Sequence, residues 1–252
     1  MKNRLSQILE ILLNKQRIEV STLSGILGVS QVTIRKDLDQ LEEKGLIVRQ
    51  HGYACLDKIN DIGKRMAYCY DIKRRIAKVA AATVEDGETV MIESGSCCAL
   101  LAEELALTKS EVTIVTNSIF ITNYIRHYPS IKIILLGGYY QPESQILVGS
   151  ITKKCGDEFY SNKFFLGVDG FSRKAGFTLG DHLRVQAIRD LSEFTRGIYI
   201  LTESDKFNRQ GTISLERTDK IVKVFTDEKL PPDAETILRG DNIQIYKVPI
   251  YE

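Results

Sequence analysis

Apolar runs of strand length alternate with helical stretches in the part of the chain that follows residue 70. Each run ends in small or polar residues, and the runs occupy residues 89–92, 112–115, 131–136, 164–168 and 198–201. Strands that alternate with helices are typical of βαβ units, whose strands pair in parallel. This alternation is the strongest constraint on the fold, and it predicts an α/β, Rossmann-like domain with a mostly parallel sheet.

A change of pattern near residues 57–65 separates this part from what precedes it. Charged residues and a glycine interrupt the apolar periodicity there. We predict a linker over residues 59–70 between an N-terminal domain, residues 1–58, and a second domain, residues 71–252. The second domain is expected to open with a helix from about residue 71 to residue 84. A chain of 252 residues is long enough for two domains of ordinary size.

Short helical patterns fill the N-terminal domain. The first helix has an apolar stripe made of Leu5, Ile8, Leu9 and Leu12. Ser21 is placed to cap a second short helix, and Gly28 then turns the chain into Ser30, which is placed to cap a third. Two helices joined by a tight turn that contains glycine predict a helix-turn-helix over about residues 20–39.

The third helix, expected from about residue 31 to residue 44, has two different faces. Its inward positions are Ile34, Leu38 and Leu41. The opposite side carries hydroxyl, amide and cationic donors, namely Thr33, Lys36 and Gln40, with Arg35 at the flank. Such a face suits the major groove of DNA, where Arg or Lys reads guanine and Gln reads adenine. The alternatives are a small helical bundle with solvated charges, and an Arg35 that pairs with Asp39 one turn along.

A hairpin is predicted directly after this helix. Residues 46–56 form two short strand patterns around a turn at His51 and Gly52. A hairpin in this position is the wing of a winged helix-turn-helix, so the N-terminal domain is expected to be α+β. Arg49 and His51 are then placed to reach the phosphate backbone or the minor groove beside the helix.

Three short runs in this domain match a known pattern. They read VSQVTIRKDL at 29–38, LEEKGL at 41–46 and RQHG at 49–52. They resemble the winged helix-turn-helix of the DeoR family of bacterial sugar-metabolism regulators. Lys36 stands where a second arginine is usual, which weakens bidentate recognition of guanine, and Tyr53 replaces a wing glycine. The candidate DNA-binding residues are Ser30, Gln31, Thr33, Arg35, Lys36, Gln40, Arg49 and His51.

Polar and small residues gather after the strands of the second domain. The carboxyl ends of parallel strands share one edge of the sheet, where ligands bind near the point at which the strand order reverses. The loop after residues 89–92 leads into a helix, whose free N–H groups and dipole favour a phosphate. Structural needs alone also produce βα turns rich in glycine and serine. The candidate ligand-binding residues are Ser94, Gly95, Ser96, Cys97, Thr116, Asn117, Ser118, Gly137, Gly138 and Asp169, with Lys206 as the cation set against a phosphate.

A second resemblance to the DeoR family extends over almost the whole second domain. The matching segments are 93–97, 116–118, 137–138, Gly149 and 204–207. The resemblance implies a domain similar in fold to sugar-phosphate isomerases, one that senses phosphorylated sugars. Departures from the family pattern are Glu93 in place of aspartate, Ser96 and Cys97 in place of two threonines, and Gln186 in place of lysine.

Cys97 and Cys98 raise a separate hypothesis. Thiols at a helix N-terminus can have a lowered pKa and act as a redox switch, and the competing interpretation is the packing of two small side chains. The five cysteines are scattered without a C-x-x-C pair, which indicates reduced thiols and a cytoplasmic protein.

Composition excludes several classes of partner. The chain has 34 Lys and Arg against 33 Asp and Glu, a net charge of +1, so DNA must be met by a local patch. No run approaches the ~18 apolar residues of a membrane span, so no membrane partner is expected. The three histidines are far apart in sequence, and we expect neither a metal nor a cofactor.

These features predict a transcriptional repressor of a sugar-catabolism operon whose affinity for operator DNA is controlled by a phosphorylated sugar. One small DNA-reading domain contacts only a half-site, so we expect a homo-dimer or tetramer. The alternative is an enzyme similar to a sugar-phosphate isomerase, with Asp169 or Glu93 as the base. A third hypothesis is a DNA-binding protein whose sheet domain only oligomerises. Because a helix-turn-helix has no place in an isomerase, we predict a regulator without catalytic residues.

Overall fold

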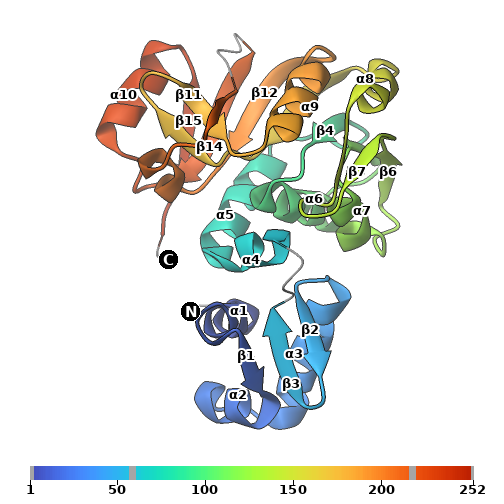
Figure 1. Cartoon of the computed structure of the whole chain (residues 1–252), viewed down its shortest axis with the longest axis vertical. Helices are drawn as coiled ribbons and strands as arrows, with labels where there is room; N and C mark the ends of the chain where they lie inside the picture. The colour runs from blue at the N-terminus through green and yellow to red at the C-terminus, as the bar shows by residue number, and fades with distance from the viewer. Residues whose placement is uncertain (1–2, 57–60, 216–219, 251–252) are drawn as a thin grey trace. The chain divides into compact units, whose positions relative to one another are not determined.

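The computed structural model describes residues 3–56, 61–215 and 220–250 (Figure 1). The chain divides into two compact units, Met1–Asp71 and Ile72–Glu252. Of the predicted linker, residues 59 and 60 lie outside the described residues. Within the predicted linker the structure has a helix, α4 (Asp61–Ala67). The next helix, α5 (Tyr70–Ala81), begins one residue before the predicted start at residue 71 and ends three residues before the predicted end at residue 84.

The first unit is a winged helix-turn-helix, as predicted. Its helices are α1 (Arg4–Lys15), α2 (Val20–Leu27) and α3 (Gln31–Glu43), followed by α4 at its end. Its antiparallel sheet has the order β1–β3–β2, with β1 at Arg17–Glu19, β2 at Ile47–Gln50 and β3 at Tyr53–Leu56. Strand β1 was not predicted. It has only three residues, and one apolar residue between two charged ones is too short an alternation to identify a strand.

Local capping explains where the helices of this unit begin and end. Ser30 accepts a hydrogen bond from the Thr33 N–H at 3.2 Å and so caps α3, as expected. Gly28 ends α2 with a φ of 65°, a left-handed conformation that glycine adopts at little cost. The expectation that Ser21 caps α2 is wrong, because the helix begins one residue earlier, at Val20.

The second unit is built on a seven-stranded sheet in which every pair of neighbours is parallel. The strand order is β15–β14–β12–β9–β4–β5–β6. The strands are β4 (Thr89–Ile92), β5 (Val112–Thr116), β6 (Ile131–Leu135), β9 (Ser161–Leu166), β12 (Thr195–Leu201), β14 (Ile221–Asp227) and β15 (Gln244–Val248). The predicted fold class is therefore confirmed.

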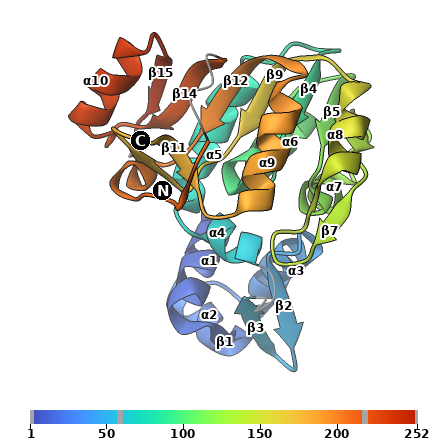
Figure 2. The ribbon, with the colours of Figure 1, turned by 45° about the horizontal axis from the view of Figure 1, so that its top comes forward.

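Helices and small antiparallel pieces complete this unit. Most of α5 belongs to this unit, and its other helices are α6 (Ser96–Thr108), α7 (Ile119–Ile125), α8 (Ser150–Asp157), α9 (His182–Ser192), α10 (Pro232–Gly240) and the 3-10 turn η1 (Ser204–Asn208). One small sheet joins β10 (Gly170–Ser172), β11 (Gly176–Leu179) and β13 (Ile213–Ser214), and a hairpin pairs β7 (Tyr139–Gln141) with β8 (Ile146–Val148). Figure 2 shows α9 lying along a face of the large sheet, with α8 beside it.

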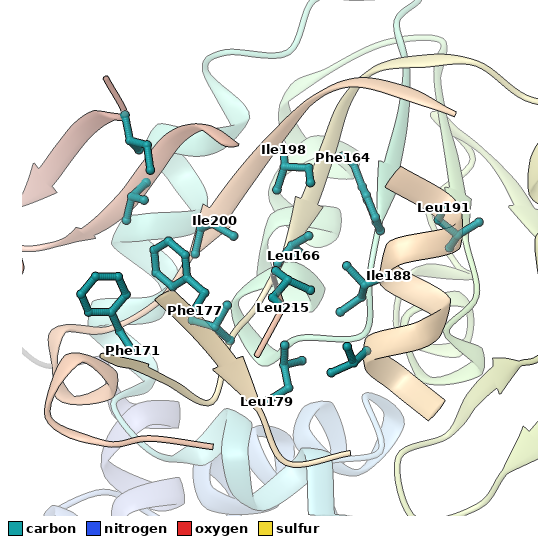
Figure 3. Packing of buried hydrophobic residues seen from close by; sticks show 14 of the residues in the cluster. Phe164, Leu166, Phe171, Phe177, Leu179, Ile188, Leu191, Ile198, Ile200 and Leu215 are labelled. Carbon is teal, nitrogen blue, oxygen red and sulfur yellow. The ribbon is translucent and has the colours of Figure 1, made fainter. Parts of the chain in front are cut away.

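Alternate residues of the central strands enter cores on opposite faces of the sheet. Phe164 and Leu166 belong to a large buried cluster that also contains Ile188 and Leu191 of α9 (Figure 3). Phe165, between them in sequence, instead has its ring 5.2 Å from that of Tyr199 on the neighbouring strand. Burial of both faces explains why these strands read as continuous apolar runs in the sequence.

The strand order reverses between β4 and β9. From β4 the chain proceeds through β5 to β6 in one direction, and from β9 through β12 and β14 to β15 in the other. The loops that leave two neighbouring strands at such a point run in opposite directions and leave a crevice at the carboxyl edge of the sheet. The loops after β4 and β9 are therefore where a ligand site is expected.

The central strand β9 should dominate the stability of the second unit. Leu166→Ala removes a fully buried side chain and should cost about 2–5 kcal/mol, because the well-packed cluster around it cannot fill the cavity. Urea denaturation followed by far-ultraviolet circular dichroism measures the cost. Leu135→Ala is the control, since Leu135 lies on the edge strand β6 with 41% of its surface exposed. Equal urea midpoints for the two variants would contradict this account of the core.

Candidate functional site

The outward face of α3 presents donors to solvent. Gln31, Arg35, Lys36 and Gln40 are exposed, and Thr33 is half-buried. Arg35 and Lys36 have no hydrogen bond or ion pair to any described residue. Ser30 and Thr33 are bound to each other at 2.9 Å between their hydroxyl oxygens. The face that the sequence assigned to DNA is therefore open, whereas Ile34, Leu38 and Leu41 are fully buried behind it.

Two carboxylates of α3 are neutralised by cations from elsewhere in the first unit. Asp37 accepts two hydrogen bonds from the guanidinium of Arg4, one from Nε at 2.5 Å and one from Nη2 at 3.0 Å. Asp39 forms an ion pair with Arg49 of the wing, so the alternative in which Asp39 pairs with Arg35 is wrong. Arg35 and Lys36 are thus left as exposed charges on the same helix as two compensated carboxylates.

The wing turns through two residues with positive φ. His51 has a φ of 45° and Gly52 a φ of 84°, the pattern of a two-residue hairpin turn whose twist matches that of the strands. His51 is exposed at the tip, and Arg49 is half-buried beside α3. Sequence reasoning missed Arg17 of β1, whose guanidinium carbon lies 4.0 Å from the centre of the Tyr53 ring. The Tyr53 ring therefore holds the Arg17 guanidinium beside the wing tip.

In the second unit, the loops after β4 and β9 approach each other closely. A Cβ atom on Gly95 would lie 3.0 Å from the Gly167 Cα, and one on Gly167 would lie 3.2 Å from the Gly95 Cα. Neither position tolerates a side chain unless the backbone moves. Gly95 is also the residue before α6 and supplies no side chain to cap it. The first N–H groups of α6 therefore have neither intrahelical acceptors nor a side-chain cap at the point where the strand order reverses.

A buried ion pair joins these loops to α9. The Glu93 carboxylate accepts hydrogen bonds from Arg184 at 2.6 Å and 2.9 Å, and the guanidinium also reaches the Gly167 carbonyl at 3.4 Å. The side chains of Glu93 and Arg184 are 1% and 5% exposed. Burial alone would lower the pKa of Arg184, but the Glu93 carboxylate outweighs it and raises that pKa above its ordinary value. Glu93 is therefore a structural anion and is poorly suited to act as a general base.

Several hydroxyls among the candidate ligand-binding residues are used by the fold itself. The Ser94 hydroxyl donates to the Glu93 carboxylate at 2.6 Å. The Thr116 hydroxyl donates to the Ile92 carbonyl at 2.6 Å and accepts from the Ser118 N–H. Ser118 accepts a hydrogen bond from the Ile121 N–H and caps α7. These contacts tie the ends of β4 and β5 together.

Asn117 differs from its neighbours. Its amide donates to the Leu147 carbonyl at 2.9 Å, but its side-chain oxygen is buried and has no hydrogen-bond partner among the described residues. A buried amide oxygen without a donor is costly, which makes it a candidate acceptor for a ligand.

Gly137 and Gly138 follow β6 and are small for reasons of packing. A Cβ on Gly138, whose φ is 152°, would overlap the Thr152 hydroxyl at 2.1 Å, and Thr152 donates to the Gly137 carbonyl. The two glycines thus allow α8 and the β7–β8 hairpin to approach the end of β6. No hydrogen bond links them to the loops after β4 and β9 within the described residues.

The remaining candidates, Asp169 and Lys206, lie after β9 and β12. Asp169 accepts from the Gly180 N–H at 3.0 Å and lies 3.5 Å from the Arg184 guanidinium. Lys206 is half-buried in η1, and its ammonium has no hydrogen bond or ion pair to any described residue. Gln186, which stands where the family has a lysine, is exposed and bonds to Asp190 on its own helix.

The structure does not support lowered thiol pKa at Cys98. Burial raises the pKa of Cys98 well above its ordinary value, and the nearby Glu93 carboxylate adds to the increase. Both Cys97 and Cys98 are buried and form no disulfide, which agrees with the packing interpretation.

Two charged residues beside the crevice were missed by sequence reasoning. Lys73 of α5 is 1% exposed, and its ammonium lies 3.6 Å from the carboxylate of Glu203, which follows β12. The Cys97 thiol lies 3.9 Å from the other carboxylate oxygen of Glu203. Lys73 is one of several cations on its helix, so no sequence pattern distinguished it from the solvated ones.

Metal-ligating clusters and membrane-spanning helices bear on possible partners. Over residues 3–56, 61–215 and 220–250, no group of three or more His, Cys, Asp or Glu side chains is arranged to hold a metal ion. No described helix has both the length and the apolar character needed to cross a membrane.

A winged helix-turn-helix joined to a parallel-sheet domain whose strand order reverses defines the class, a DNA-binding regulator with a sensor domain. The family of DeoR-like helix-turn-helix domains matches residues 4–60, and the family of DeoR C-terminal sensor domains matches residues 69–228. The chain belongs to the DeoR family.

Relatives of similar length carry regulatory names. The chain is 28% identical over 251 residues to a protein of Escherichia coli O157:H7 described as an aga operon transcriptional repressor, with 97% of this chain and 93% of the relative covered. It is 29% identical over 231 residues to the regulator GolR of Listeria innocua, with 90% and 91% covered. It is 27% identical over 241 residues to the glycerol-3-phosphate regulon repressor of Escherichia coli K12, with 94% and 95% covered. The chain is a transcription regulator and not an enzyme.

The chain also matches solved structures of an isomerase and a regulator, both with TM-scores below 0.5. A D-ribose-5-phosphate isomerase in complex with phospho-erythronic acid has a TM-score of 0.42 and 15% identity, and the match covers 55% of this chain and 54% of that one. The full-length sorbitol operon regulator SorC from Klebsiella pneumoniae has a TM-score of 0.41 and 11% identity, with 93% and 97% covered. Identities this low concern the fold alone.

The buried ion pair at the crevice gives a stability prediction. Arg184→Met leaves the Glu93 carboxylate buried without its cation and should cost about 3–5 kcal/mol. Adding Glu93→Leu removes the orphaned charge, so the double variant should regain a large part of that loss. Urea denaturation of the three proteins measures both effects. A double variant no more stable than Arg184→Met would show that the cost comes from lost packing and not from the uncompensated charge.

Proposed function

We propose that this regulator represses a sugar-catabolism operon and that a phosphorylated sugar controls its affinity for operator DNA. The observation that carries the proposal is the outward face of α3, where Arg35 and Lys36 face solvent while Asp37 and Asp39 are neutralised. Repression is supported by relatives that are named as repressors. The five free cysteines are consistent with action in the cytoplasm, where thiols stay reduced.

In this proposal α3 enters the major groove of the operator. Arg35, Lys36 and Gln40 supply the donors that distinguish base edges. The α3 N-terminus with Ser30, Gln31 and Thr33 holds phosphates, and Arg49 and His51 of the wing contact the backbone or minor groove. The Asp39–Arg49 pair is partly exposed, so exchange of that carboxylate for a phosphate costs little.

The sensor site in this proposal is the crevice at the carboxyl edge of the sheet. The N-terminus of α6, preceded by Gly95, receives the phosphate with the backbone of Ser96 and Cys97. Lys206 is the cation set against the phosphate, and Asn117 and Asp169 supply acceptors for hydroxyl groups. The other candidates shape the site without contacting the ligand. The hydroxyls of Ser94, Thr116 and Ser118 form hydrogen bonds within the protein, and Gly137 and Gly138 allow close packing.

The proposed regulator acts as a homo-dimer or tetramer. A single winged domain places one helix in one groove and therefore reads a half-site, so a symmetric operator requires at least two copies. Effector and operator favour different states of the assembly, and each lowers the affinity for the other by the same factor.

Arg35 gives the most direct test of the DNA proposal. Duplexes selected by the wild-type protein from a random library provide the probe. Arg35→Ala should weaken binding to them by about 1–3 kcal/mol, because one base contact is lost, while the folded state is unchanged. Arg196→Ala, which removes an equally exposed cation from β12, is the control. Unchanged affinity of Arg35→Ala, measured by fluorescence anisotropy, would disprove the assignment of the reading face.

The sensor proposal is tested by thermal shift with a panel of sugar phosphates and their unphosphorylated parents. A ligand at 100 times its dissociation constant adds about 2.7 kcal/mol to stability, so a phosphate-dependent rise in Tm is expected. Lys206→Ala should reduce that rise and leave DNA binding intact. Lys109→Ala, at the opposite end of α6, is the charge-matched control and should respond as the wild type does. Absence of any shift in the wild type would refute the sensor proposal.

A further inference from the structure

The first turn of α3 exposes an apolar side chain to solvent. Val32, the second residue of the helix, has 61% of its surface exposed. Among the described residues of the first unit no large apolar side chain is more exposed, and the next is Ile26 of α2, at 51%. Single apolar residues are common on protein surfaces, so exposure alone assigns no role to Val32. What distinguishes Val32 is its position on the helix.

Val32 lies near the middle of the face that the proposed function assigns to DNA. It precedes the fully buried Ile34 by two positions, which places it about 160° from Ile34 around the helix axis. It is three residues before Arg35 and four before Lys36, so the three side chains are neighbours on the helix surface. Arg35 and Lys36 are exposed as well. An apolar group is therefore set among the charged donors of this face.

The stability of the helix gives no reason for a valine at this position. A β-branched side chain loses rotamer freedom in a helix, and alanine, lysine or glutamine would favour the helix more. An exposed side chain also gains little from the hydrophobic effect, in contrast to the fully buried Ile34. A contact that forms only in a complex gives the exposed side chain of Val32 something to bury against.

The major groove of DNA offers one apolar group for such a contact. The C5-methyl group of thymine projects into the groove, and apolar side chains recognise it there. The first residues of a recognition helix are those that contact base edges. A valine cannot replace the hydrogen bonds that water makes to the polar edges of the other bases, so it also disfavours them. The chemistry of Val32 therefore selects thymine among the four bases.

We propose that Val32 is a specificity-determining residue of the operator contact and packs against the C5-methyl group of a thymine in each half-site. This inference rests on the proposed function and adds a base to the sequence that the regulator reads. Neighbouring side chains on one helix face are roughly 5–6 Å apart, and successive bases of a strand are ~3.4 Å apart, so the thymine is within about two base pairs of the base that Arg35 contacts.

The test removes one methyl group from the DNA and the valine methyl groups from the protein. The probe is the duplex that the wild-type protein selects from a random library, with its thymines replaced one at a time by deoxyuridine. Deoxyuridine lacks only the C5-methyl group and keeps the base pair. Val32→Ala favours the helix, so the variant is expected to fold. The matched control is Val222→Ala on β14, because Val222 is also exposed, at 37%, and belongs to the second unit.

Fluorescence anisotropy gives, for each protein, the ratio of its affinities for the thymine and deoxyuridine duplexes. Burial of one methyl group makes binding about fourfold tighter, so we expect one position in each half-site at which deoxyuridine weakens wild-type binding by that factor. Val32→Ala should bind the two duplexes within about twofold of each other, since its contact with the methyl group is already lost. Val222→Ala should keep the ratio of the wild type.

Other outcomes overturn the inference in distinguishable ways. If Val32→Ala keeps the wild-type ratio, another residue reads the methyl group. A methyl effect more than about two base pairs from the base at which Arg35→Ala loses its preference contradicts the geometry of the helix face. A selected duplex in which no thymine methyl group matters overturns this inference alone. If the wild type selects no duplex from the library, the proposed function fails together with it.

Discussion

The close approach of Gly95 and Gly167 is the constraint on which the sensor domain depends. It brings the loops after β4 and β9 together at the reversal of strand order, where Arg184 of α9 bonds to Glu93 of one loop and to the Gly167 carbonyl of the other. The Glu93–Arg184 pair then fastens that arrangement. A parallel sheet offers a crevice at any reversal of strand order, but this contact determines which groups line it.

The division of charge in the first unit follows a similar logic. Helix α3, the proposed reading helix, has two aspartates that would repel phosphates if they were left unpaired. Arg4 and Arg49 come from different elements, and each neutralises one of them. The chain has almost no net charge. Its affinity for DNA therefore depends on where a small number of charged residues are placed, and not on an overall excess of cations.

The sequence predicted the elements with strong periodicity and the loops with local chemistry. The Ser30 cap, the hairpin turn at His51 and Gly52, and the strands β4, β5, β6, β9 and β12 follow from neighbours within a few residues of each other. The partners of Arg184 and Lys73 could not be predicted in this way, because Glu93 and Glu203 are far from them in sequence and meet them only through the tertiary fold. For the same reason the hydroxyls of Thr116 and Ser118 were assigned to a ligand, although the folded chain itself uses them.

The contact between Gly95 and Gly167 also determines which positions near the proposed site can accept a different residue. Any side chain at Gly95 or Gly167 would push the two loops apart, so neither position offers a route to new ligand preferences. Ser96 is half-buried, and the Asn117 and Glu203 side chains each keep an unsatisfied acceptor. Diversification of the sensor, by evolution or in a designed library, should therefore concentrate on those three positions while the glycine pair stays fixed.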